Sequence, residues 1–108
     1  MATTNSSATP VMDARKTSIL ARFTPTSNVT TEQYDDAISQ LEKSGDWLPE
    51  GLEFHVAFKS DGKFRVSEIW DSREQLYAFE GRLMPVLKNV GIEPGKPEIL
   101  EIYNIVKR

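Results

Sequence analysis

Alternating polar and apolar residues on both sides of a tight turn form the clearest pattern in the chain. Residues 52–60 and 63–70 each have the composition and alternation of a strand. Asp61-Gly62 between them is a strong signal for a two-residue type I′ turn, in which both positions need positive φ. The pattern therefore predicts a β-hairpin over residues 52–70.

A first helix is predicted before this hairpin. Thr30 and Gln33 have the spacing of a capping box, in which side chains satisfy the free amides of a helix start. Apolar residues then recur three or four positions apart, at Tyr34, Ala37, Ile38 and Leu41. Gly45 tolerates the left-handed conformation that ends a helix, so the helix should end there.

A second helix is predicted directly after Trp70. Ser72 and Gln75 repeat the capping-box spacing, and Gly91 is the expected end. Its apolar stripe consists of Leu76, Phe79, Leu83, Leu87 and Val90. Because proline removes a helical hydrogen bond, Pro85 should kink or break this helix near Leu83 and Met84 and open a second short segment.

A first and a last strand complete the pattern, at residues 18–23 and 97–106. The resulting order is βαββαβ, which predicts an α+β, ferredoxin-like fold with a four-stranded antiparallel sheet and both helices on one face. The last strand is apolar on both alternating sets, although helices can cover only one face of the sheet. A second copy stacked on the bare face would bury it, so we expect a homodimer.

Composition limits the classes of partner and the cellular compartment that we expect for this protein. The 108 residues carry a net charge of −3 without a basic stripe, so nucleic acid is not an expected partner. Residues 1–16 have no apolar run that could be a secretion signal or span a membrane, so we expect a disordered tail before a single domain over 17–108. We expect a cytoplasmic protein. Without cysteine and with one histidine, no metal site is expected.

The hairpin register decides what surrounds the single histidine, His55. If Ser60 faces Lys63, His55 lies opposite Glu68, on a face that also carries Glu53, while Leu52 lies on the other face. A three-residue turn with a bulge would instead set His55 beside Ser67. We favour the first register, because the second places Glu68 in the middle of an apolar face without a partner.

The chain also resembles a known group of proteins. The resemblance rests on residues 51–57 (GLEFHVA), 66–72 (VSEIWDS), 76–79 (LYAF), 83–87 (LMPVL) and 103–105 (YNI). These stretches are similar to the dimeric α/β-barrel superfamily, and within it to relatives of the antibiotic-biosynthesis monooxygenases. The resemblance implies a homodimer that encloses pockets for small apolar or aromatic molecules, and in several relatives oxygenation of polycyclic aromatics without a cofactor.

Departures from the superfamily limit what can be transferred. The haem-degrading branch has a tryptophan and a histidine in its second helix, and this chain has neither, so haem is not expected. Many close look-alikes read His-Asn in the last strand, where this chain reads Tyr103-Asn104. Chemistry that needs two histidines is therefore not implied.

The candidate site residues gather around the hairpin and the last strand. His55 is the candidate proton acceptor, with Glu68 as the carboxylate that orients it. Phe64 and Trp70 are the expected aromatic wall, and Tyr103 or Asn104 a hydrogen-bond donor; the last two point to opposite faces of a regular strand. A purely structural histidine–carboxylate pair explains the same residues.

Two functions follow from these residues. The first is a cofactor-independent monooxygenase, in which His55 withdraws a proton from a phenolic substrate and the resulting carbanion reduces oxygen. The second is a non-catalytic, ligand-binding or stress-related dimer whose cavity holds a small apolar molecule. Replacing His55 should abolish oxygen consumption under the first, and alter only ligand affinity or dimer stability under the second.

Overall fold

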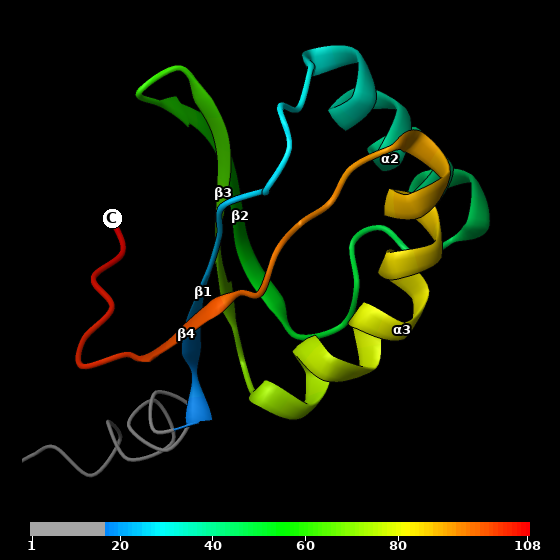
Figure 1. Cartoon of the computed structure of the whole chain (residues 1–108). Helices are drawn as coiled ribbons and strands as arrows, with labels where there is room; N and C mark the ends of the chain where they lie inside the picture. Colours follow the sequence, from blue (N-terminus) through cyan, green and yellow to red (C-terminus); the bar gives the residue numbers. More distant parts are fainter. Residues whose placement is uncertain (1–16) are drawn as a thin grey trace, which may run out of the picture.

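The computed structural model describes residues 17–108, which fold as alternating strands and helices (Figure 1). The elements are β1 (Ile19–Phe23), α2 (Thr31–Ser44), β2 (Leu52–Ser60), β3 (Lys63–Trp70), α3 (Arg73–Val90) and β4 (Glu98–Glu101). The strands form one sheet in the order β2-β3-β1-β4, with every neighbouring pair antiparallel. Both helices lie on one side of this sheet, so the predicted βαββαβ, ferredoxin-like fold is confirmed.

Helix α2 has the predicted ends. The Thr30 side chain accepts a hydrogen bond from the Gln33 amide, and the Gln33 side chain accepts one from the Thr30 amide. Gly45 closes the helix with a φ of 82°. The capping box and the terminating glycine could therefore both be read from the sequence.

Helix α3 does not break at Pro85 and opens no second segment there, in contrast to one of the two predicted outcomes. It begins after Ser72 and ends at Gly91 as expected, but it continues through the proline without a break. A proline ring normally clashes with the carbonyl four residues earlier. Here that residue is Gly81, which is exposed like Pro85, so water can hydrate the carbonyl left without a partner. Packing of Leu83 and Leu87 against the sheet side supports both halves of the helix.

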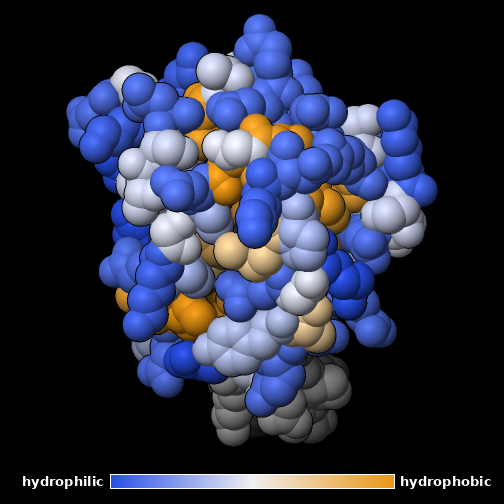
Figure 2. All heavy atoms as spheres, turned by 45° about the vertical axis from the view of Figure 1, so that its right-hand side comes forward, coloured by the Kyte–Doolittle hydropathy of each residue, from blue (hydrophilic) through white to orange (hydrophobic). Residues whose placement is uncertain are grey.

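The core lies between the sheet and the two helices. Its largest fully buried side chains are those of Trp70, Phe79, Leu41 and Leu76. A smaller cluster of Ala37, Leu87 and Ile92 joins the far ends of the helices to the segment that leads into β4. On the helix side, apolar atoms remain visible between polar side chains (Figure 2).

The β2-β3 hairpin has the predicted register. Ser60 pairs with Lys63, Val56 with Ser67, and His55 with Glu68, so the register with a three-residue turn is excluded. A bulge between Leu52 and Phe54 was not predicted. Because of this extra residue, Leu52 packs against the core and Glu53 is exposed, the reverse of the expected placement.

Strand β4 is shorter than predicted. It ends at Glu101, which pairs with Ile19, the first residue of β1. Beyond that point β1 provides no further partner, and residues 102–108 leave the sheet. The prediction of a strand over residues 97–106 is therefore wrong beyond Glu101, because the length of the neighbouring strand limits it.

The face of the sheet turned away from the helices, here called the outer face, exposes large apolar side chains. Phe54, Val56 and Phe58 of β2 are 43%, 52% and 40% exposed. The C-terminal segment lies on this side (Figure 1), and Lys107 Nζ is 5.3 Å from the centre of the Phe54 ring. Within residues 17–108 this chain therefore leaves the outer face largely uncovered.

Two further points concern the N-terminal tail and membrane spans. The expected disordered tail, residues 1–16, lies outside the described residues. Among residues 17–108, neither helix combines the length and the apolar character needed to cross a bilayer.

Candidate functional site

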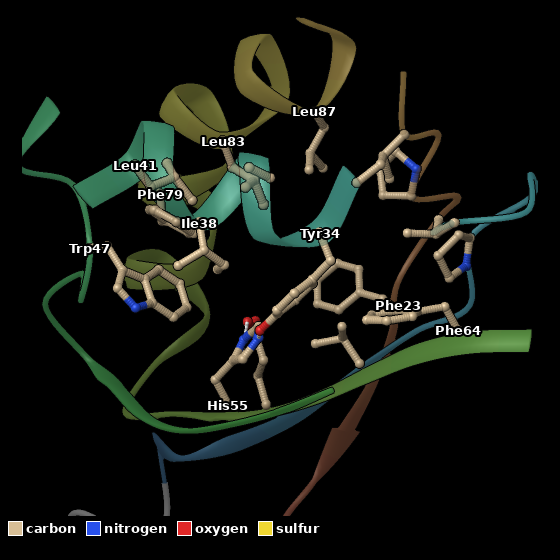
Figure 3. Close-up of a pocket in the computed structure, with 17 residues that line it drawn as sticks. Phe23, Tyr34, Ile38, Leu41, Trp47, His55, Phe64, Phe79, Leu83 and Leu87 are labelled. Atoms are coloured by element: carbon tan, nitrogen blue, oxygen red, sulfur yellow. Dashed lines mark hydrogen bonds and ion pairs between the residues drawn. The ribbon is translucent and has the colours of Figure 1, made fainter. Parts of the chain in front are cut away.

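A cavity of about 90 Å³ lies between the sheet and the helices, where the inner face of the hairpin meets α2 and α3 (Figure 3). Its walls are almost entirely apolar. The lining residues are Phe23, Pro25, Val29, Tyr34, Ala37, Ile38, Leu41, Trp47, His55, Phe64, Val66, Glu68, Phe79, Leu83, Leu87, Ile92 and Pro94. Ionisable side chains meet at one place on this lining, the position of His55.

His55 and Glu68 form the first contact of the site. They lie opposite each other on β2 and β3, and His55 Nδ1 is 2.6 Å from Glu68 Oε2. The side chains of this pair are only 14% and 7% exposed. A buried carboxylate needs hydrogen-bond donors, and the histidine supplies one of them.

Trp70 supplies the second donor. It lies two residues after Glu68 on the same face of β3, and its Nε1–H donates to Glu68 Oε1 over 2.9 Å. Each carboxylate oxygen of Glu68 thus has its own partner. This explains how a glutamate can be buried beside the core without a cationic lysine or arginine.

Tyr34 completes the chain of contacts from the opposite layer. It lies in the first turn of α2 and extends toward the sheet (Figure 3), where its hydroxyl oxygen is 2.7 Å from His55 Nε2. When the imidazole is neutral and Nδ1–H donates to the carboxylate, Nε2 has a lone pair, and Tyr34 O–H donates to it. In either protonation state the imidazole is held at both nitrogens.

The electrostatics of the site favour the protonated phenol of Tyr34. Burial raises the pKa of Tyr34 above its usual 10.0, and the nearby carboxylates of Glu68 and Asp35 raise it further. Burial also raises the pKa of Glu80 on α3, with a smaller contribution from Glu68. Near neutral pH, Tyr34 is thus a donor that keeps its proton.

Aromatic rings surround the imidazole. Trp47, from the loop between α2 and β2, meets His55 edge-on with ring centroids 5.0 Å apart. Phe64 lies on the other side of Tyr34, with ring centroids 5.1 Å apart. These rings keep the imidazole away from bulk water, which strengthens the polar contacts between them.

The structure separates the predicted site residues into two groups. His55, Glu68 and Phe64 line the cavity together. Trp70 is fully buried in the core behind them and contacts the site through Glu68. Tyr103 is 99% exposed and, like Asn104, follows the end of β4, so neither residue lines the cavity.

Two site residues were not identified as such from the sequence. Tyr34 was predicted only as part of the apolar stripe of the first helix, and Trp47 belongs to a loop. The signal for Tyr34 is its hydroxyl, because a tyrosine on a buried helix face usually finds a hydrogen-bond partner. Its pairing with His55 depends on how α2 lies across the sheet, which the sequence pattern does not define.

The arrangement suits proton transfer more than metal binding. Among residues 17–108, no three or more histidine, cysteine, aspartate or glutamate side chains are grouped to hold a metal ion. His55 instead combines an orienting carboxylate on Nδ1 with a second nitrogen, Nε2, at the cavity wall, where the hydroxyl of Tyr34 is its hydrogen-bond partner. This is the geometry expected of a general base.

Comparison with known proteins finds solved structures that are similar to this chain. Neither family models nor curated proteins match the chain. Among solved structures, a conserved protein of unknown function from Bacteroides thetaiotaomicron, named as a possible oxidoreductase, is 20% identical with a TM-score of 0.54. The match covers 81% of this chain and 99% of that protein.

Two further structures have names that refer to oxygenation. A candidate antibiotic biosynthesis monooxygenase from Deinococcus radiodurans is 12% identical, with a TM-score of 0.55 and coverage of 83% and 97% of the two chains. SnoaB, a cofactor-independent oxygenase from Streptomyces nogalater, is 8% identical, with a TM-score of 0.54 and coverage of 84% and 96%. The chain thus has the α+β, ferredoxin-like fold of the antibiotic biosynthesis monooxygenase structures, as the sequence resemblance indicated.

Proposed function

We propose that this protein binds a small aromatic molecule and oxygenates it without a cofactor, with His55 as the general base. The observation that carries the proposal is the position of His55 Nε2, a lone pair that Glu68 orients from behind at the wall of an apolar cavity. The similarity of the fold to SnoaB supports the same reaction class.

The proposed reaction begins with proton transfer. A phenolic O–H bound in the cavity gives its proton to His55 Nε2, and Glu68 stabilises the resulting imidazolium. The electron-rich ring carbon of the phenolate then reduces molecular oxygen and forms a C–O bond to it. The imidazolium returns its proton to the peroxide, which restores His55 as a base. Loss of water then breaks the O–O bond and leaves a quinone, so that one phenol and one O₂ give one quinone and one H₂O.

We further propose that the working form is a homodimer formed through the outer face. The aromatic and aliphatic side chains exposed there form a single row along β2: Phe54, Val56 and Phe58. A row of this kind can pair with its own copy around a two-fold axis, because the same apolar surface of both copies then takes part in the contact. The homodimer expected from the sequence pattern would cover these side chains.

A non-catalytic role remains the second candidate, and a specific observation favours it. His55 Nε2 already holds the hydroxyl of Tyr34 at 2.7 Å, so the same contacts stabilise a protein that only binds an apolar ligand. In this case phenols bind in the cavity and no oxygen is consumed.

Oxygen uptake with a series of one-ring and polycyclic phenols tests the catalytic proposal. His55→Ala and His55→Gln should each reduce uptake about 100-fold or more, the usual size of a general-base contribution. Tyr77→Phe changes an exposed aromatic residue of α3, outside both the cavity lining and the outer face, and should leave uptake per active site unchanged. Uptake that survives both His55 variants would contradict the proposal, and binding without uptake in the parent protein would favour the second candidate.

A further inference from the structure

We propose that Tyr34 is an internal substitute for the substrate. Its hydroxyl occupies Nε2 of His55 until the hydroxyl of an incoming phenol displaces it, and the Tyr34 ring restricts the site to single-ring phenols. This inference rests on the proposed function, because it names the substrate class of the same site. It concerns a residue of α2 that contributes no step to the reaction itself.

The first argument is the occupancy of Nε2. In the neutral imidazole that can act as a base, Glu68 accepts Nδ1–H and Nε2 offers one lone pair. The hydroxyl of Tyr34 lies 2.7 Å from Nε2. One lone pair accepts one strong hydrogen bond. A substrate hydroxyl can therefore reach Nε2 only after the Tyr34 hydroxyl has left it.

The second argument is chemical likeness. The group that holds Nε2 is a phenol, and its ring lies in the aromatic layer between His55 and Phe64, with ring centroids 5.9 Å and 5.1 Å from theirs. A substrate phenol that replaced it would find the same donor, acceptor and ring contacts. The raised pKa of Tyr34 keeps the internal phenol protonated, so it occupies the base without being consumed by it.

The third argument is size. With Tyr34 in place the cavity measures about 90 Å³, whereas an apolar cavity that holds one benzene ring measures about 150 Å³. A shift of the Tyr34 side chain that frees Nε2 makes room for one ring with small substituents. A second ring would need the space that the shifted Tyr34 side chain still fills.

The fourth argument is charge. Among the described residues, the ionisable side chains on the lining are Tyr34, His55 and Glu68, with no lysine or arginine. Burial of a ligand carboxylate beside Glu68 would be costly without a cation. The expected substrate is therefore an uncharged phenol, and a carboxylated aromatic is excluded.

Binding of 4-nitrophenol to the full-length protein tests the inference, at a pH below the pKa of this probe. Tyr34→Phe keeps the ring but removes the hydroxyl that competes for Nε2. The affinity for 4-nitrophenol should rise about tenfold, which corresponds to the loss of one competing hydrogen bond. 4-Nitroanisole, which has no proton to donate, should gain little. Tyr77→Phe makes the same change on the exposed side of α3 and should leave both affinities unchanged.

A second variant tests the size limit. Tyr34→Ala should allow 4-nitro-1-naphthol to bind, whereas the parent protein should bind this two-ring probe at least about tenfold more weakly than 4-nitrophenol. Circular dichroism confirms that each variant is folded. Because His55 is the only histidine, its ¹⁵N signals also report directly: Tyr34→Phe should shift Nε2 and leave Nδ1 hydrogen-bonded.

Three results would overturn the inference: unchanged or weaker binding of 4-nitrophenol in Tyr34→Phe, equal binding of one and two rings by the parent protein, or no binding of 4-nitrophenol by any variant. Oxygen uptake is measured on the same samples as a separate readout. Tighter binding in Tyr34→Phe without any uptake would support the role of Tyr34 and overturn oxygenation, so the two proposals can fail independently.

Discussion

The two faces of the β2-β3 hairpin reverse the usual distribution of residues. The inner face buries a glutamate, Glu68, at 6% exposure, and every polar atom of its carboxylate has a partner. The outer face of the same strands exposes phenylalanine and valine side chains at 40% or more. An acidic side chain is thus buried inside the chain, and apolar side chains are exposed on its surface.

This difference shows which parts of the molecule a single chain completes. Polar groups are buried only where hydrogen bonds satisfy them, and the inner face provides these bonds from within the chain. Large exposed apolar surfaces usually mark a contact with another molecule. The inner face therefore has its polar contacts complete within one chain, while the outer face carries the apolar side chains through which we propose the homodimer forms.

Removal of the inner carboxylate should have the largest effect. Glu68→Ala leaves Trp70 Nε1–H and His55 Nδ1–H buried without acceptors, and should lower the free energy of unfolding by about 3 kcal/mol. Urea denaturation, monitored by tryptophan fluorescence, measures this change in the free energy of unfolding. Glu68→Gln keeps one acceptor oxygen and should lose less, and Ser67→Ala on the outer face should lose least. Equal losses in all three variants would show that the inner contacts are not specific.

A charge on the outer face should affect association instead of folding. Val56→Glu places like charges near each other in a dimer formed through this face, and should raise the dimer dissociation constant about 100-fold or more. The free energy of unfolding of the monomer should change by no more than about 0.5 kcal/mol, since Val56 is half exposed. Sedimentation velocity measures the association.

Ala78→Glu is the matched control, because it adds the same charge to an exposed position on α3. It should leave the dissociation constant unchanged. A parent protein that sediments as a monomer at micromolar concentration would rule out the dimer, and a Val56→Glu dimer of parent affinity would move the interface elsewhere.

The smallest predicted effects have opposite signs on the two sides of the hairpin. On the inner side, burial raises the pKa of Glu80 above its usual 4.5, because the buried carboxylate is less well hydrated in the folded protein. The free energy of unfolding therefore falls as Glu80 ionises above pH 4.5. Beside the outer face, the hydrogen bond from Lys107 lowers the pKa of Glu53, so its charge adds stability above pH 4.5 that is lost as pH falls through its folded-state pKa.

Two glutamine variants test these signs. Near pH 7, Glu80→Gln should raise and Glu53→Gln should lower the free energy of unfolding, each by about 0.5 kcal/mol or less because both side chains are partly or largely hydrated. Both differences from the parent protein should close well below pH 4.5. Thermal unfolding across this pH range measures them, and two shifts of the same sign would refute the contrast between the faces.

The hairpin register and the helix ends could be predicted from the sequence because local chemistry determines them. Asp61-Gly62 determines the turn, and from the turn the pairing of His55 with Glu68 follows by counting. Thr30, Ser72 and the terminating glycines act on neighbouring backbone groups in the same way. Each of these signals depends on residues a few positions apart.

The errors occurred where distant segments decide the outcome. The end of β4 depends on the length of β1, the continuity of α3 at Pro85 depends on packing and on Gly81, and the contact between Tyr34 and His55 depends on how α2 crosses the sheet. Tyr103 and Asn104 were assigned to the site because the last strand was predicted to continue past them. Sequence periodicity carries no information on these long-range limits.

The bulge at the start of β2 has a consequence for insertions and deletions. In a regular strand, gain or loss of one residue turns every later side chain to the opposite face. The extra residue here lies between Leu52 and Phe54, before His55. A change of length in residues 45–53 can therefore be absorbed at the bulge while His55 stays in phase with Glu68, and the part of the site that such a change would disturb is the contact of Trp47 with the His55 ring.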